Sequence, residues 1–592
     1  MRALRQSTFA LVLAVAGLSL AQAAAPGASP ELNKLFDDYF EKSLELSPLQ
    51  ATFIGDDRYD DKLTNSISPE FIRMALEVDR SYLDAALKYD PKKLSPEDRL
   101  SWEIFVHERR VSIESAKFPG ELLPIDQMFS IPTLMPVLAS ATSAQPFKTV
   151  EDYDQFLARM NDYITWSDQA VVNMREGIRR NVVQPRVVMQ NVQKQLAALI
   201  AEDPLKSIFY TPVTQFPDGF AAADRTRLEK AYRDAVVSKI NPSYRRLHDF
   251  VRDEYLPKTR ATVAWTALPD GPAWYAFLVK NSTTTEMTPD EIHDLGLKEV
   301  ARILAEMEQV KTQVGFKGDL NAFFRYLQDD PKFYYTKADD LIAGYQDVKR
   351  RIDAVLPKYF SLFPKADYEV RAVEAFRAES AAGGSYQQPS ADGSRPGIFY
   401  VNTFNLKAQP KFGMETLSLH EAAPGHHFQI SIQQELTELP RFRRFGGNYT
   451  AYVEGWALYA ESIGKEMGLF TDPYQYYGRL SDEMLRALRL VVDTGLHTRG
   501  WTREKAIQYM LDNSSMAKSD VEAEVERYIA NPAQALGYKI GQIRIRQMRV
   551  KAEKALGGKF DIKQFHTEVL RDGALPMGVL EAKIDRWIAA NK

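Results

Sequence analysis

Residues 449–461 read YTAYVEGWALYAE. A helix through this stretch is apolar or aromatic on nearly every side, which is typical of a helix buried inside a large protein. Two carboxylates, Glu454 and Glu461, lie seven residues apart and share one face of that helix. Because a buried carboxylate needs a cation or strong hydrogen bonds, the stretch predicts a helical core that contains a polar site.

Helix-start signals recur along the chain. Ser95-Pro96 and Thr288-Pro289 each place a capping residue before a proline at the first helical position, and Glu291 completes a capping box. Apolar residues follow at helical spacing, as in 32–46 and 292–314. We therefore expect a mostly α fold, with a small β element near the active-site cleft.

One segment interrupts the helical pattern. Residues 381–397 (AAGGSYQQPSADGSRPG) are too rich in Gly, Ser and Pro for a helix, and they lead into the best strand candidate, residues 398–403. As an edge strand it could align an extended peptide, which makes Tyr400 and Asn402 candidate substrate-binding residues. The alternative is a small structural hairpin.

Composition excludes several classes of protein. Among the 592 residues, Lys and Arg number 75 and Asp and Glu number 79, so the formal charge is −4, and 45% of residues are hydrophobic. These values exclude a disordered or collagen-like chain. A slightly acidic chain also gives no basic footprint, so we expect no nucleic-acid partner.

The first residues indicate export. A basic start is followed by an apolar run at 9–20 and by Ala21-Gln22-Ala23, which together predict a signal peptide over residues 1–23, with a short membrane anchor as the alternative. No later stretch is long and apolar enough to span a bilayer, so we expect a periplasmic or secreted product without stable membrane insertion. The chain has no cysteine, which excludes disulfides, cysteine zinc ligands and lipid attachment at the cleavage site.

The chain after the signal peptide divides, weakly, into two regions. Residues 24–285 form an N-terminal helical region, and residues 286–592 carry the candidate chemistry. We expect one continuous two-lobed unit.

The main motif is HEAAPGHH at residues 420–427. In the zincin motif HExxH, two His residues on one helix face bind Zn²⁺ and the Glu activates water. Here Pro424-Gly425 displaces the second His, and an unbroken helix is not expected. A bulge that absorbs two residues would bring His426 into the ligand position beside His420; His427 is the rival, and a helix end without metal is the bland alternative.

The third ligand must come from elsewhere, and Glu454 is the best candidate. Glu461, on the same face, could hold a ligand histidine as a supporting group. Each of these carboxylates could instead be satisfied by an arginine of a neighbouring helix.

Two later segments supply further candidates. Arg486, Arg489, Asp493 and His497 share one helix face; Asp493 could orient His497, which could stabilise an oxyanion. The alternative is a buried Arg–Asp network, which we favour for the two arginines. Farther on, Tyr538 is a second candidate oxyanion donor, and an arginine such as Arg546 could receive a substrate carboxylate.

Several motifs together resemble a bacterial family with a domain of unknown function. These are HEAAPGHH, EGWALYAE at 454–461, the DTGLH and RGWTREKA segments from residue 493, PAQALGY at 532–538, and the stretches 46–61 and 283–297. Members of that family are commonly exported and are grouped with gluzincin-type zinc metallopeptidases. The resemblance implies a zincin-like fold and a downstream Glu ligand, which matches Glu454. By analogy with helical gluzincins, His497 and Tyr538 would bind the oxyanion.

Taken together, the residues and the resemblance predict an exported zinc metallopeptidase. One Zn²⁺ would be bound by His420, His426 (or His427) and Glu454, and Glu421 would be the proton carrier. The substrate would be a short peptide. The alternatives are a zinc hydrolase of a small non-peptide amide or ester, and a metal-dependent binding protein without turnover.

Overall fold

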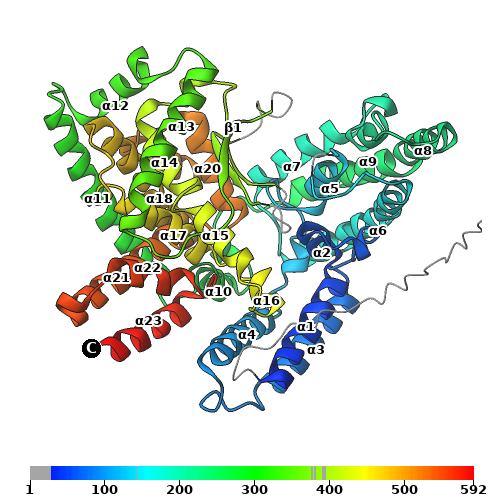
Figure 1. Cartoon of the computed structure of the whole chain (residues 1–592). Coiled ribbons are helices and arrows are strands. Elements are labelled where there is room, and N and C mark those ends of the chain that lie inside the picture. Colours follow the sequence, from blue (N-terminus) through cyan, green and yellow to red (C-terminus); the bar gives the residue numbers. More distant parts are fainter. Residues whose placement is uncertain (1–28, 142, 375–377, 379–381, 390–394) are drawn as a thin grey trace, which may run out of the picture.

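The computed structural model describes residues 29–141, 143–374, 378, 382–389 and 395–592. The predicted signal peptide at residues 1–23 lies outside the described residues. Within them the fold is mostly α with one small sheet, as Figure 1 shows, which confirms the predicted fold class. No helix in the described ranges is both long and apolar enough to cross a membrane.

The α-helices before residue 285 contribute side chains to both large hydrophobic clusters. They are α1 (Pro30–Leu46), α2 (Pro48–Ile54), α3 (Pro69–Ala86), α4 (Pro96–Ser115), α5 (Ile131–Ala139), α6 (Val150–Arg180), α7 (Arg186–Leu199), α8 (Ala222–Ala235), α9 (Asn241–Phe250) and α10 (Gly271–Thr283).

The α-helices after residue 285 carry the candidate site. They are α11 (Pro289–Gln313), α12 (Leu320–Asp329), α13 (Ala338–Val355), α14 (Met414–Glu421), α15 (His426–Glu435), α16 (Arg441–Arg444), α17 (Thr450–Ile463), α18 (Pro473–Thr498), α19 (Arg503–Asn513), α20 (Lys518–Ala530), α21 (Leu536–Leu556), α22 (Ile562–Leu570) and α23 (Met577–Asn591).

Helix starts follow the capping signals in the sequence. The Ser95 side chain caps α4 by accepting a hydrogen bond from the Asp98 backbone N–H, and Thr288 and Glu291 form the expected capping box at the start of α11. From there α11 packs along α18, which carries the polar helix face noted in the sequence.

The sheet has three strands in the order β1-β3-β2: β1 (Tyr368–Ala372), β3 (Gly397–Val401) and β2 (Gly384–Gln387). β1 is parallel to β3, and β2 is antiparallel to it. The predicted strand is therefore the central one, and every residue of β3 is buried. The expectation that the Tyr400 strand aligns a substrate is wrong, because β1 and β2 already occupy both of its edges.

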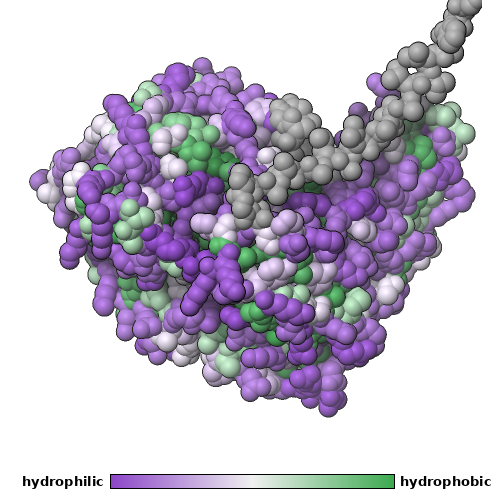
Figure 2. Space-filling model, turned by 60° about the horizontal axis from the view of Figure 1, so that its bottom comes forward, coloured by the Kyte–Doolittle hydropathy of each residue, from purple (hydrophilic) through white to green (hydrophobic). Residues whose placement is uncertain are grey.

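Two large hydrophobic clusters form the core. Each contains side chains from before and after residue 285, so packing is continuous across that position. The face of the molecule in Figure 2 is mostly hydrophilic, with hydrophobic residues in small scattered groups.

The buried helix α17 lies directly against α21. A Cβ atom added to Gly455 would lie 2.6 Å from the Gly541 backbone, and one added to Gly541 would collide with the Ala451 carbonyl. The two glycines therefore let the helix backbones approach closely, which fixes the position of Glu454, the neighbour of Gly455.

Candidate metal centre

The helix that begins at Met414 ends at Glu421, and a separate helix begins at His426. Between them Ala422 has φ −108° and ψ −113°, and Gly425 has φ −74° and ψ −124°. The break occurs where the Pro-Gly pair predicts it. The predicted bulge is wrong in form, because α14 and α15 are joined by a turn and are not one continuous helix.

Close packing holds this turn in place. A Cβ atom on Gly425 would lie 2.0 Å from the His420 carbonyl oxygen, so only glycine fits there. The indole N–H of the fully buried Trp456 donates a hydrogen bond to the Pro424 carbonyl at 2.7 Å. The chain turns back so that the His420 and His426 ring centroids lie 4.8 Å apart.

Three side chains from α14, α15 and α17 converge on one point. Glu454 Oε2 lies 3.4 Å from His420 Nε2 and 3.5 Å from His426 Nε2. One ligand-type atom of each residue lies within 4.8 Å of the others. Zinc with tetrahedral bonds of about 2.0–2.1 Å holds its ligand atoms about 3.4 Å apart, so these separations fit one ion.

The hydrogen bonding of the three side chains fits the same interpretation. Within the described residues, the buried atom Glu454 Oε2, which faces both histidines, has no hydrogen-bond partner. A buried polar atom without a partner is costly. Two imidazoles and one carboxylate are also a common donor set for zinc.

A supporting carboxylate lies behind His420. The carboxylate is that of Glu461. His420 Nδ1 donates to Glu461 Oε1 at 2.7 Å, and the Thr416 hydroxyl donates to Glu461 Oε2 at 3.0 Å. This arrangement directs His420 Nε2 toward Glu454, as outer carboxylates do at metal sites. Thr416 was missed in the sequence, although its spacing of four residues before His420 places both on one helix face.

The charges of His420 and Glu454 act on one another. Burial lowers the pKa of His420, but the Glu454 and Glu461 carboxylates outweigh it and raise the pKa to about 10. Burial raises the pKa of Glu454, but His426 and His420 hold it well below its usual range. The Glu454 carboxylate is therefore ionised and faces the two histidines, an arrangement that attracts a cation.

Glu421 and Asp482 complete the acidic surroundings. Glu421 is the last residue of α14 and directly follows His420. Burial raises the pKa of Asp482 on α18 to about 6, and the charges of Glu461, His420 and Glu421 all act on it. Asp482 was missed in the sequence; its spacing of four residues before Arg486 was the available signal.

His427 lies apart from this group. Its Nε2 donates to the Ala366 carbonyl at 3.1 Å, and its Nδ1 accepts from the Tyr386 hydroxyl at 2.9 Å. Burial lowers its pKa to about 4, so the ring is neutral. With both nitrogens engaged, His427 is not the second ligand; it joins α15 to the β2 strand.

The prediction that His497 stabilises an oxyanion is wrong. The ring is fully buried, Nδ1 accepts from the Trp265 backbone N–H at 3.1 Å, and Nε2 donates to the Tyr528 carbonyl at 3.0 Å. Burial lowers its pKa to about 3. His497 is a neutral core residue whose two hydrogen bonds are both made to backbone.

Asp493 does not orient His497. Its Oδ1 accepts from the Tyr275 hydroxyl at 2.6 Å, and its Oδ2 accepts from the Ala533 backbone N–H at 3.0 Å. Burial raises its pKa to about 7. Asp493 therefore ties α18 to α10 and to the turn that precedes α21.

The remaining candidates have other neighbours. The Tyr538 hydroxyl accepts from Arg527 Nη2 at 3.4 Å, and its role as an oxyanion donor stays a prediction. The Asn402 amide donates to the Ala378 carbonyl at 2.7 Å, and its Oδ1 accepts from the Phe404 N–H at 3.0 Å, so the side chain shapes the turn after β3.

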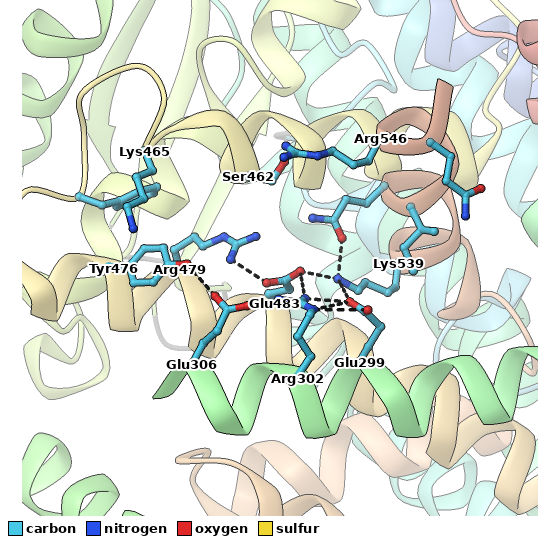
Figure 3. Close-up of a pocket in the computed structure, with 14 residues that line it drawn as sticks. Glu299, Arg302, Glu306, Ser462, Lys465, Tyr476, Arg479, Glu483, Lys539 and Arg546 are labelled. Carbon is cyan, nitrogen blue, oxygen red and sulfur yellow. Dashed lines mark hydrogen bonds and ion pairs between the residues drawn. The ribbon is translucent and has the colours of Figure 1, made fainter. Parts of the chain in front are cut away.

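Arg546 lines a separate cavity of about 470 Å³, shown in Figure 3. Lys539, which also lines the cavity, contacts Glu483 at 2.5 Å and Glu299 at 3.0 Å. None of the three ligand-type residues lines this cavity. Arg546 itself lies 3.4 Å from Glu466, which gives it a carboxylate partner away from His420.

Comparisons with known proteins give a family and a fold. A family described as "Bacterial protein of unknown function (DUF885)" matches residues 48–584. A protein from Colwellia psychrerythraea, described as a candidate lipoprotein, aligns with a TM-score of 0.85 at 29% identity, covering 95% of this chain and 99% of its own. A second candidate lipoprotein of unknown function, from Shewanella oneidensis, aligns with a TM-score of 0.75 at 19% identity, covering 94% and 99%. A search of curated proteins found no match.

Proposed function

The chain belongs to this bacterial family (DUF885), and we propose that it is an exported zinc-dependent metallopeptidase that hydrolyses short peptides. The observation that carries the proposal is the convergence of His420, His426 and Glu454 at the spacing of a tetrahedral metal site. These three residues would hold the ion, and Glu461 would keep His420 in position.

Glu421 is the proposed proton carrier. A zinc ion at this position supplies a Lewis acid that polarises a carbonyl group and lowers the pKa of water. Glu421, which directly follows His420 and whose charge acts on the His420 ring, would take a proton from the attacking water and pass it to the leaving amine. The C–N bond breaks, and the products are a carboxylate and an amine.

The proposal of a peptide substrate rests on the resemblance to a family grouped with gluzincin-type metallopeptidases. The test combines metal content with turnover. We expect one zinc per chain in the wild type and in Glu421→Gln, no zinc in His420→Ala, and peptide hydrolysis by the wild type alone. Hydrolysis that survives in Glu421→Gln would remove the proton carrier from the mechanism.

A panel of peptides, small amides and esters tests the substrate class. Turnover of esters or non-peptide amides without peptide hydrolysis would replace the peptidase by a general zinc hydrolase. Zinc binding without turnover of any substrate would leave a binding protein.

The proposed location rests on residues 1–23 and on the two similar proteins described as candidate lipoproteins. N-terminal sequencing of the mature protein from a bacterial host tests it. We expect cleavage after about Ala23.

A further inference from the structure

The cavity shown in Figure 3 lies among α11, α17, α18 and α21, and none of the three candidate metal ligands lines it. Its volume of about 470 Å³ is in the range of pockets that bind small molecules. Charged side chains dominate its wall, together with a few apolar groups such as Phe470 and Ile543. The pairing of these charges indicates what kind of molecule the cavity can bind.

Most of the charged groups neutralise one another. In a network on α11, α18 and α21, three cations contact three carboxylates at 2.5–3.0 Å; these are Arg302, Arg479 and Lys539, with Glu299, Glu306 and Glu483. A second group, with contacts of 2.7–3.4 Å, consists of Arg546, Arg549, Glu466 and Glu553. Each group has as many carboxylates as cations, so neither leaves a net charge at the cavity.

Lys465 is the exception. Its ammonium group lies 4.6 Å from the centroid of the Tyr476 ring, and in the part of the chain that the structure describes it contacts no carboxylate. The Tyr476 hydroxyl donates to Glu306 at 2.7 Å, which fixes the ring beside which Lys465 lies. After every ion pair of the cavity wall has been followed to its last partner, one positive charge therefore remains, at Lys465.

Arg479 has unused hydrogen-bond donors beside this charge. Its guanidinium group lies 5.9 Å from the centroid of the same Tyr476 ring. Arg479 Nη1 is 2.8 Å from Glu483 Oε2, but that oxygen accepts no hydrogen bond, and Arg479 donates none to any residue that the structure describes. Only 10% of the Arg479 side chain is exposed. Because a guanidinium group left without acceptors in such a place is costly, an acceptor is expected in the cavity.

We propose that the cavity binds a small organic acid with a single carboxylate group. That carboxylate accepts hydrogen bonds from Arg479, whose planar fork matches it, and its charge compensates that of Lys465. The carbon skeleton of the acid lies against Phe470 and Ile543, which line the same cavity. This site needs neither zinc nor peptidase activity, so either proposal can fail without the other.

Hexanoate, its neutral analogue hexanamide and inorganic phosphate are the probes. Calorimetry is carried out on the full chain carrying His420→Ala, which removes the zinc ion as a competing site for a carboxylate. We expect hexanoate to bind, and hexanamide to bind at least about 10-fold more weakly, because hydrogen bonds to a charged group are lost. The wild type should bind hexanoate at least as tightly as His420→Ala does.

Two variants locate the site. Arg479→Gln should weaken hexanoate binding at least about 10-fold, and Lys465→Gln should weaken it about 2- to 5-fold, as expected for an exposed charge. Lys465 has no ion pair to lose, so Lys465→Gln keeps the test valid if Arg479→Gln fails to fold. Arg544→Gln is the matched control, because Arg544 on α21 contacts Glu581 at 2.5 Å and does not line the cavity.

Several outcomes would overturn the proposal. Equal affinity for hexanoate and hexanamide would exclude a carboxylate site, and phosphate that binds as tightly as hexanoate would exclude selection of a monoacid. Wild-type binding that disappears in His420→Ala would place the carboxylate at the metal centre. Absence of hexanoate binding at millimolar concentration, or unchanged binding in both Lys465→Gln and a folded Arg479→Gln, would refute the cavity as the site.

Discussion

Glu461 accepts a hydrogen bond from His420 Nδ1 at 2.7 Å, two helical turns beyond the carboxylate of Glu454 on the same helix. One helix thus supplies both a candidate ligand and the group that orients another ligand. We expect Glu461→Ala to weaken zinc binding about 10- to 100-fold, because the His420 ring loses its fixed direction. Competition with a chelator measures the affinity. The exposed Glu504→Gln is the control, and unchanged affinity in Glu461→Ala would contradict the supporting role.

The two adjacent histidines should respond differently to mutation. His426→Ala should abolish stoichiometric zinc, whereas His427→Ala should retain it and lose about 1–3 kcal/mol of unfolding free energy, because the Tyr386 and Ala366 groups lose their partner. Metal analysis and urea denaturation distinguish the two effects. Zinc loss in His427→Ala with an intact fold would reverse the assignment.

Removal of zinc should lower the free energy of unfolding by an amount that depends on the zinc concentration relative to its Kd. An ion held by α14, α15 and α17 binds only the folded chain, so zinc at about 100 times its Kd adds about 2.7 kcal/mol. Thermal melting with and without chelator should show this stabilisation in the wild type. The shift should disappear in Glu454→Gln; a shift that persists there would place the ion elsewhere.

The turn between α14 and α15 should tolerate no side chain at Gly425. A Cβ atom there meets two carbonyl oxygens, those of His420 at 2.0 Å and Leu419 at 2.3 Å. We expect Gly425→Ala to cost more than about 3 kcal/mol and to reduce zinc binding. Gly578→Ala is a matched control, because nothing lies within 4 Å of its added Cβ atom. Similar denaturation midpoints for the two variants would contradict the tight turn.

His497 should make stability depend on pH. Burial lowers its folded-state pKa to about 3, whereas the unfolded ring ionises near 6.5, so the unfolded state binds the extra proton between these values. The stability that comes from keeping the buried His497 ring neutral is complete above pH 6.5 and is lost as the pH falls toward 3. The stability difference between wild type and His497→Gln should therefore be about 2 kcal/mol smaller at pH 5 than at pH 8. Urea denaturation at both pH values measures it; a constant difference would show that the folded ring is protonated.

Local signals in the sequence predicted the helices well. Capping residues such as Ser95 and Thr288 act within one turn, so their effect is readable without tertiary information. Strands β1 and β2 were missed, because pairing with β3 depends on residues distant in sequence. For the same reason the sequence could not show that β3 is central.

For the candidate site, too, local features could be predicted from the sequence and tertiary contacts could not. The helix break at Pro424-Gly425 and the spacing of Glu454 and Glu461 can be read directly from the sequence. The groups that pack against a helix face cannot be read from the sequence in this way. His497 is an example, because its partners are backbone groups of Trp265 and Tyr528. Arg486 and Arg489 pair with Asp482 and Glu524, and the Glu524 partner on α20 could not be read from the spacing within α18.

The close contact between Gly455 and Gly541 limits which substitutions the metal centre can tolerate during evolution. Two hydrogen atoms face each other where side chains would otherwise separate the helices, so no methyl group can be inserted at either position without pushing Glu454 outward. Homologous chains that keep the histidines yet carry a larger residue at either glycine should have lost the third ligand's alignment. These two small residues, which touch no ion, therefore mark which sequences can still assemble the centre.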